Sequence, residues 1–325
     1  MTKYFSGAQS GYTNSATTNA IVVSGGTFTG NLVNSGKVTP GSPNGIYVEG
    51  GSTIDGTISN AGTISVGAGA GIAVGTTSCD NSVVEGGIVN ANGAAIDGRF
   101  GVQIGDVSSF GGGIANNGTI SAARTGIDVF SVSTFTGGIA NHGTISTSGR
   151  SFDAIFVDAS TFVGGITNSG TISIAGGSIA DIVVSGGVFS GSIVNAASGI
   201  IAEKSSGVGI VVGARTFVGN VINAGTISAS TVGISVNDSV FSGSITNAGT
   251  ISAHFAGING VVPSSVRVAS SIAAPSTPTL ESPLFLSRLS PAASPTAGRF
   301  RHKTRELRSI SARVFPAASL TGAGD

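Results

Sequence analysis

Apolar residues recur along this chain at every second position, in short runs that repeat with a regular period. Counting back from a recurrent asparagine, an aliphatic residue stands at −2, a glycine at −4 and a Phe or β-branched residue at −6. Offsets of two put these residues on one face of a strand, and that apolar face is expected to point inward. The glycine at −4 would then also point inward and leave room for a Phe ring. No segment has the 3.6-residue apolar period of a helix, so no helix is expected.

The recurrent asparagine marks nine copies of one repeat between Phe28 and Ser252, spaced 24 to 30 residues apart. The clearest copy runs from Phe135 to Ser146 and reads Phe-Thr-Gly-Gly-Ile-Ala-Asn-His-Gly-Thr-Ile-Ser. A period of this length is typical of solenoids, whereas the blades of a β-propeller need about 40 residues. We expect the asparagines to form a hydrogen-bonded structural ladder. They are Asn34, Asn60, Asn90, Asn116, Asn141, Asn168, Asn195, Asn223 and Asn247.

Three short strands and three corners fit within one repeat. Asn-x-Gly predicts a corner, because Asn and Gly both tolerate left-handed backbone. Gly-Thr-Ile-Ser then predicts another strand, and Gly-Ile-x-Val, as at Gly126 to Val129, predicts a third. One coil cannot bury its own apolar face, but stacked coils can. The sequence therefore predicts an all-β fold: a single-stranded parallel β-helix of about nine coils, three strands per coil, with Phe and Ile columns inside.

The repeat stops after Val262, and the composition changes with it. Seven of the nine prolines lie beyond this point, but only three of the 53 glycines. A shifted reading frame explains the change: suitable codons for Gly-Gly-Ile-Thr-Asn-Ser-Gly-Thr-Ile-Ser, read one base late, translate as Ala292 to Arg301. We therefore expect residues 1–262 to form the β-helix domain. Residues 263–325 are expected to be a disordered tail, a frame-shifted continuation of the repeats.

The net charge of zero conceals two opposite parts of the chain. Residues 1–262 hold 7 Lys and Arg against 12 Asp and Glu, whereas residues 263–325 hold 8 against 3. Because a shifted frame is not a selected sequence, the basic tail does not indicate a nucleic-acid partner. No apolar stretch approaches the length of a membrane-spanning helix and no signal peptide is visible, so no membrane insertion by this chain is expected.

Residues that could carry chemistry are few. The single Cys79 rules out an internal disulfide and is expected to be a buried or half-buried thiol. His142 fills the variable place of Asn-x-Gly as an exposed turn residue, and His254 lies in a loop without a partner. Three His and one Cys build no recognisable metal site, so no catalytic, cofactor-binding or metal residue is expected.

Acidic residues could serve an enzyme that cleaves polysaccharides, which needs two carboxylates at a defined separation. The acids of this chain fall in different columns of the repeat, so they are expected to be solvated corner residues that form no pair. They are Asp97, Asp106, Asp128, Asp153, Asp158, Asp181 and Asp238.

Outward Thr-x-Ser pairs are expected to form a flat hydroxyl array, with about 4.8 Å between coils. Such arrays occur on ice-binding β-helices, and Thr and Ser are also ordinary solvent-facing strand residues. The pairs are Thr63/Ser65, Thr119/Ser121, Thr144/Ser146, Thr171/Ser173, Thr226/Ser228 and Thr250/Ser252.

The pattern Phe-x-Gly-Gly-Ile-x-Asn-x-Gly-Thr-Ile-Ser resembles the passenger region of bacterial autotransporters, the type V surface proteins. That family implies export through the outer membrane by a C-terminal β-barrel, and often adhesion. Neither export signal nor barrel is visible here, so a fragment is expected, from a parent that is secreted or displayed at the cell surface.

The resemblance implies a structural and adhesive role rather than an enzyme. Partners would be glycans or proteins on host or neighbouring cells, with self-association as a further possibility. Two alternatives are an ice-binding or self-associating Thr-x-Ser face and a carbohydrate-active enzyme, which the unaligned acids disfavour.

Overall fold

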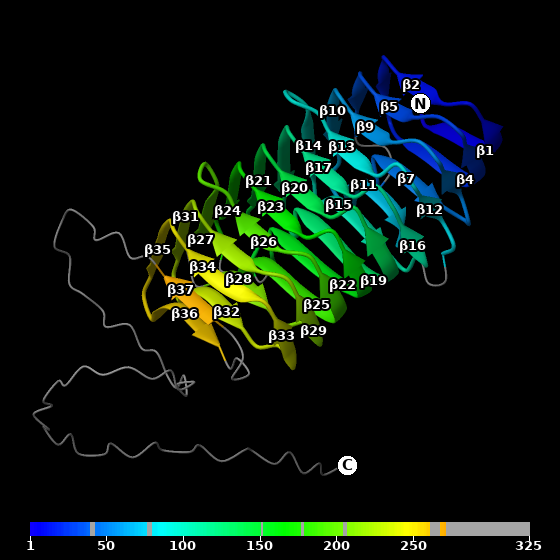
Figure 1. The fold of residues 1–325 in the computed structure, drawn as a ribbon. Helices are drawn as coiled ribbons and strands as arrows, with labels where there is room; N and C mark the ends of the chain where they lie inside the picture. Colours follow the sequence, from blue (N-terminus) through cyan, green and yellow to red (C-terminus); the bar gives the residue numbers. More distant parts are fainter. Residues whose placement is uncertain are drawn as a thin grey trace, which may run out of the picture. The chain divides into compact units, whose positions relative to one another are not determined.

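The structure, a computed structural model, describes residues 1–39, 43–76, 80–150, 152–176, 179–203 and 207–260, and the backbone of 267–270. These residues form an all-β solenoid of about nine turns, in which parallel strands stack in three sheets (Figure 1). Each coil passes through the three sheets in turn. The predicted fold class, a parallel β-helix with three strands per coil, is confirmed.

The first sheet, here called the long sheet, carries both the Gly-Ile-x-Val segment and the Phe of each repeat. Among the described coils, four have one continuous strand that spans the two segments, and in five others two shorter strands share them. Its strands are β1 (Lys3–Gln9), β4 (Ile21–Phe28), β7 (Ile46–Glu49), β8 (Thr53–Ile54), β11 (Ala70–Gly75), β12 (Val83–Val84), β15 (Phe100–Gly105), β16 (Ser109–Phe110), β19 (Ile127–Thr136), β22 (Ile155–Val163), β25 (Ala180–Ser190), β28 (Val208–Val212), β29 (Thr216–Val218), β32 (Val232–Val236), β33 (Val240–Ser242) and β36 (Ala256–Gly260).

The second sheet, the Asn sheet, carries the aliphatic-x-Asn segment of each repeat. Its strands pair in register, so that each asparagine lies opposite the asparagine of the next coil from β2 to β34. They are β2 (Tyr12–Asn14), β5 (Leu32–Asn34), β9 (Ile58–Asn60), β13 (Ile88–Asn90), β17 (Ile114–Asn116), β20 (Ile139–Asn141), β23 (Ile166–Asn168), β26 (Ile193–Asn195), β30 (Val221–Asn223), β34 (Ser244–Asn247) and β37 (Arg267–Ser270).

The third sheet, the Thr-Ser sheet, carries the Thr-Ile-Ser segment. The central isoleucine of each such strand points into the core, as the period-2 pattern predicts. The strands are β3 (Thr17–Thr18), β6 (Lys37–Val38), β10 (Thr63–Ser65), β14 (Ala95–Gly98), β18 (Thr119–Ala122), β21 (Thr144–Thr147), β24 (Thr171–Ile174), β27 (Ile200–Glu203), β31 (Thr226–Ala229) and β35 (Thr250–Ala253).

The core is a set of columns that run from coil to coil. From Phe110 to Phe241 the rings stack with centroids 4.7 to 5.1 Å apart and planes within 17° of parallel. Most of these rings are fully buried, and each buried side chain of this size contributes about 1.5–3 kcal/mol of apolar transfer. The predicted Phe and Ile columns therefore form the hydrophobic core of the stack.

The glycine at −4 does not point into the core, and this detail of the sequence interpretation is wrong. The chain turns there, between the Phe of the long sheet and the Asn sheet. Gly137 and Gly138 have φ angles of 93° and 73°. A Cβ on Gly137 would lie 2.5 Å from the backbone nitrogen of Gly113 in the preceding coil. Glycine is required because the corner is left-handed and the coils nearly touch.

The Asn-x-Gly corner exists, but its glycine serves close approach rather than left-handed backbone. Gly143 and Gly170 are absent from the described glycines with positive φ. A Cβ on Gly143 would lie 2.0 Å from the carbonyl oxygen of Gly118, and one on Gly170 equally close to that of Gly143. Any side chain at these positions would force neighbouring coils apart.

Strand β37 lies beyond residue 262, where the predicted β-helix domain ends. It pairs with β34 in parallel register, and Ser270 stands opposite Asn247. The remainder of the predicted tail lies outside the described residues, as does Cys79.

Candidate interaction site on the Thr-Ser sheet

The predicted asparagines form a continuous hydrogen-bonded column through the Asn sheet. Each Nδ2 donates to the Oδ1 of the asparagine in the next coil, at 2.7 to 2.9 Å in nine successive bonds. The column begins at Asn14, one coil earlier than the sequence predicts. The repeat pattern misses this coil because it lacks the glycine at −4 and the Phe or β-branched residue at −6. Its other members are Asn34, Asn60, Asn90, Asn116, Asn141, Asn168, Asn195, Asn223 and Asn247.

The ladder closes the corners of the coils and has no open contact with solvent. The Asn141 side chain is fully buried, and its Nδ2 also approaches the carbonyl oxygens of Gly143 and Thr171, both at 3.3 Å. Its backbone carbonyl accepts from the N–H groups of Ser169 and Gly170. These asparagines therefore satisfy buried polar groups and present no surface for a ligand.

The Thr-x-Ser pairs lie in register on the outer face of the Thr-Ser sheet. Strands β18, β21 and β24 align three successive threonines and three successive serines. The array is interrupted on both sides. Strand β14 supplies Ala95 and Asp97 at these positions, and β27 supplies Ile200 and Ala202.

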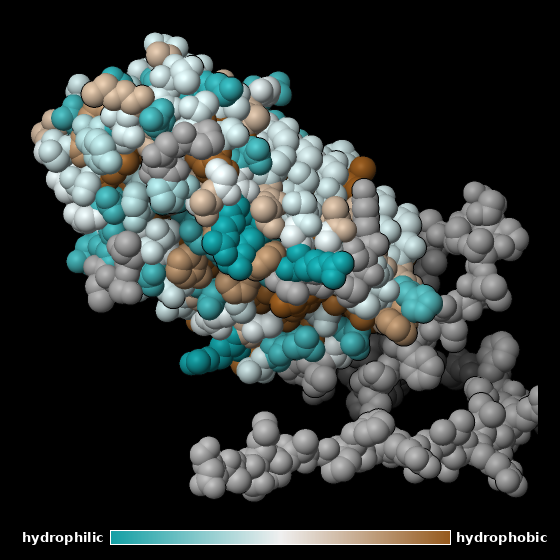
Figure 2. All heavy atoms as spheres, turned by 180° about the vertical axis from the view of Figure 1, so that it is seen from behind, coloured by the Kyte–Doolittle hydropathy of each residue, from teal (hydrophilic) through white to brown (hydrophobic). Residues whose placement is uncertain are grey.

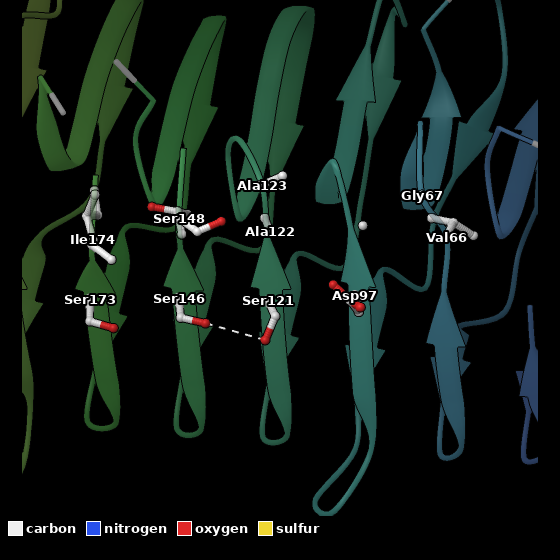
Figure 3. Close-up of a pocket in the computed structure, with 13 residues that line it drawn as sticks. Val66, Gly67, Asp97, Ser121, Ala122, Ala123, Ser146, Ser148, Ser173 and Ile174 are labelled. Carbon is white, nitrogen blue, oxygen red and sulfur yellow. Dashed lines mark hydrogen bonds between the residues drawn. The ribbon is translucent and has the colours of Figure 1, made fainter. Parts of the chain in front are cut away.

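The serine column of the array borders a recess. A groove of about 470 Å³ runs along that column. Figure 3 shows one wall, where Asp97, Ser121, Ser146 and Ser173 stand one to a strand in a line. Ser146 Oγ donates to Ser121 Oγ at 3.4 Å. The groove is also lined by Val66, Gly67, Gly98, Ala122, Ala123, Thr147, Ser148, Ile174 and Ala175.

The groove owes its shape to small residues after the Thr-Ile-Ser segment. Ala123, Ser148 and Ala175 occupy the position where the chain leaves the sheet in successive coils, and none of them fills the space beside the serines. Hydroxyls and one carboxylate therefore face a recess open to solvent. This arrangement can exchange hydrogen bonds with a polyhydroxylated ligand.

The prediction that the acids are solvated corner residues is wrong for four of them. Asp97 and Asp158 are exposed and Asp106 is half-buried, whereas the others are at most 9% exposed. Strands β19 and β25 begin with runs of consecutive buried residues, so outward positions there are covered too. The buried acids are Asp128, Asp153, Asp181 and Asp238.

Asp181 is the most deeply buried of these carboxyls. It is 0% exposed, and neither of its oxygens has a hydrogen-bond partner. Burial raises its pKa to about 9, and the charges of Glu203 and Asp153 act in the same direction. Asp181 is therefore protonated at neutral pH, because ionising it would strand a charge in the interior.

Burial also raises the pKa of Asp153 to about 6, although the Ala180 N–H donates to its Oδ1 at 3.1 Å. The pKa of Asp238 rises to about 7 for the same principal reason. These carboxyls lie apart from the groove, whose described lining contains one acid, Asp97.

Neither histidine completes a reactive cluster. His142 is exposed, and its Nδ1 lies 2.7 Å from Ser169 Oγ; His254 is exposed and meets the Phe255 ring edge-on. Within the described residues no group of three His, Cys, Asp or Glu side chains could hold a metal ion.

The outer surface is mixed in polarity. Figure 2 shows hydrophilic and near-neutral residues over most of the face seen from behind, with hydrophobic residues in smaller groups between them. On the long sheet Val163, Val188, Val218 and Val240 are 41–51% exposed and alternate with Thr or Ser. In the described part of the chain no helix has the length and hydropathy to span a bilayer.

No protein-family model, curated protein or solved structure matches the chain.

Proposed function

We propose that this chain is a structural and adhesive module of a surface protein resembling autotransporter passengers. The repeat between Phe28 and Ser252 supports this proposal, since it resembles the repeats of that family's passenger regions. The parallel stack of coils provides the stalk, and its surface provides the contacts.

The observation that carries the adhesive part is the groove along Asp97, Ser121, Ser146 and Ser173. The interior of the solenoid is filled by stacked rings, isoleucines and the asparagine ladder, so a ligand must bind outside. Hydroxyls repeated about every 4.8 Å suit an extended chain of sugars better than a compact metabolite. The proposed partner is therefore a surface glycan.

Binding of the full chain to immobilised polysaccharides tests this proposal. Ser146→Tyr places a ring in the groove and should abolish binding. Ser228→Tyr is the matched control, because Ser228 occupies the same column of the sheet in a coil that does not line the groove. Equal binding by the two variants would contradict the assignment of the groove.

We further propose that the groove binds glycans without cleaving them. Hydrolysis of a glycosidic bond by the usual route needs two carboxylates, and Asp97 is the one acid among the described lining residues. The expected result is no release of reducing ends from any polysaccharide that the chain binds. Release that disappears in Asp97→Asn would contradict this proposal.

A display role at the cell surface is tested by the DNA on either side of the coding region. The proposal expects an export signal upstream and a translocator-encoding region downstream. Unrelated flanking genes would remove the support for a passenger.

An ice-binding face remains a second candidate. The in-register Thr-Ser pairs of β18, β21 and β24 favour it, whereas the interruptions at Asp97 and Ile200 limit the array to three coils. Thermal hysteresis that disappears on Thr144→Leu would support this alternative.

A further inference from the structure

Three arginines cluster where successive coils leave the groove. Arg99 directly follows Gly98, and Arg124 directly follows Ala123, both of which line the groove. The Arg124 N–H donates to the Arg99 carbonyl at 2.7 Å, so the two residues lie on adjacent coils one above the other. Arg150 follows in the next coil, and it is exposed like Arg99.

This clustering stands out against the composition of the solenoid. Residues 1–262 contain only seven Lys and Arg, and three of these stand 8 or 9 residues after the asparagines of three consecutive coils. The same part of the chain carries 12 acids. The arginines therefore form a local basic patch on an otherwise acidic domain.

Two phenylalanine rings hold the guanidinium groups in place. The Arg124 Cζ lies 4.4 Å from the centroid of the Phe152 ring and 5.9 Å from that of Phe100. The Arg99 Cζ lies 5.9 Å from the same Phe100 ring. Stacking on aromatic faces fixes the planar fork of an arginine before a ligand arrives, which lowers the entropy lost on binding.

Neither stacked arginine has an internal counter-charge. Within the described residues, the side-chain contacts of Arg99 and Arg124 are with these rings, and no carboxylate pairs with either. A guanidinium presents five N–H donors in a geometry that matches a carboxylate. The patch is thus ready to accept an anionic group from outside.

We propose that the groove and this patch, here called the arginine rim (Arg99, Arg124 and Arg150), bind a linear polysaccharide bearing uronic-acid carboxylates. The inference rests on the proposed function and names the class of its ligand. Sugar hydroxyls exchange hydrogen bonds with the serine wall and Asp97, while the acid groups reach the arginine rim, which adjoins the groove after Gly98 and Ala123.

Binding of the full chain to an oligogalacturonate and to a neutral maltooligosaccharide of equal length tests the inference. The acidic probe should bind at least about tenfold more tightly, because one charge-assisted hydrogen bond accounts for a factor of this size. Its affinity should fall as ionic strength rises, and that of the neutral probe should not.

Arg99→Gln and Arg124→Gln should each lower the affinity for the acidic probe about tenfold and leave the affinity for the neutral probe unchanged. Arg215→Gln is the matched control, because Arg215 is exposed on the long-sheet side and does not line the groove. Circular dichroism verifies that each variant is folded. Should Arg124→Gln not fold, Arg99→Gln carries the test, since Arg99 is exposed.

The outcomes separate this inference from the proposed function. Ser146→Tyr could abolish binding of both probes while both arginine variants bind normally. In that case adhesion through the groove stands, and the assignment of an acidic ligand is wrong. If a sulfated glycan binds and the uronate does not, the carboxylate assignment is overturned. If no glycan binds the chain at any ionic strength, both the inference and the proposed function fail.

Discussion

Asn141 shows how one side chain can join three coils. Its Oδ1 accepts from Asn116, and its Nδ2 donates to Asn168, both at 2.8 Å. The neighbouring position is different: His142 is exposed and meets one serine hydroxyl. Of two adjacent residues in one corner, one is therefore buried in the ladder and the other lies at the surface.

We expect Asn141→Ala to lower the free energy of unfolding by about 1–3 kcal/mol, because it removes the ladder bonds of the Asn116 Nδ2 and the Asn168 Oδ1, both of which are buried. His142→Ala is the control, and its effect should stay within about 0.5 kcal/mol, as for most surface substitutions. Chemical denaturation of both variants measures the difference. Equal midpoints would mean that the ladder is incidental to stability.

The burial of an aspartate at the start of β25 could not be predicted from the alternation of residues along the chain. Asp181 occupies a position that a simple in-out alternation assigns to the surface, yet it is buried. Alternation assumes that only one face of a strand is covered, and at the start of β25 both faces are. No pattern of residue types along the chain reveals that coverage.

At the scale of the element, the corners set the spacing of the coils. The carbonyl oxygen of Gly118 lies where a Cβ on Gly143 would be, and the same relation recurs one coil later. Strands that hydrogen-bond across about 4.8 Å leave no room for a side chain directed along the stack. The corner glycines are therefore packing residues.

Gly143→Ala should lower the free energy of unfolding by about 1–3 kcal/mol, because the new methyl group overpacks a contact with backbone that cannot move aside. Gly67→Ala is the matched control, since a Cβ there meets nothing within 4 Å and its φ needs no glycine. Thermal melts of the two variants compare them directly. A Gly143→Ala protein as stable as Gly67→Ala would refute close packing at this corner.

The elements were largely predictable from the chain, and the groove was not. The spacing of Asn, Ile and Phe was sufficient for the strands, the three sheets and the ladder. Period-2 reasoning failed at Gly137, because a straight strand and a glycine corner carry the same residue pattern. The groove depends on how small residues such as Ala123 follow a strand. The sequence feature that could have pointed to this region is the arginine that recurs at a similar offset in three coils, at Arg99, Arg124 and Arg150.

At the scale of the whole molecule, buried carboxyls make the stability of the solenoid depend on pH. Asp181 has a folded pKa of about 9 against about 3.9 in an unfolded chain. Between these values the unfolded state is ionised and the folded state keeps its proton. Folded Asp181 therefore binds more protons, so stability falls as pH rises from about 4 to about 9.

Asp181→Asn removes this titration while keeping size and polarity. The variant and the parent should have similar stability near pH 4, and the variant should become the more stable protein as pH rises. The difference between their free energies of unfolding grows by at most about 1.4 kcal/mol per pH unit and levels off above about pH 9. Urea denaturation across this range measures it. A gap that stays constant with pH would show that Asp181 does not hold its proton.

The coding DNA provides a further test at this scale. We predict that the frame one base upstream of Ala292 reads Gly-Gly-Ile-Thr-Asn-Ser-Gly-Thr-Ile-Ser, the in-frame form of the repeat. Sequencing of the coding region decides it. Codons that give no repeat in that frame would make the similarity a coincidence. A restored frame should extend the asparagine column, since its asparagines would fall at the positions of Ile272, Thr296 and Thr321 and continue the period.

The asparagine ladder also gives the solenoid a net dipole along the stack of coils. Every ladder bond runs from the Nδ2 of one coil to the Oδ1 of the next, so the amide dipoles add from Asn14 to Asn247. Backbone bonds between coils run both ways, as in Lys3 N–H to Ala20 and Ser35 N–H to Asn14, and largely cancel. Aligned amides polarise one another, by about 10–30% per bond. A bond in the middle of the row is therefore reinforced from both sides, and an interruption weakens bonds several coils away from it.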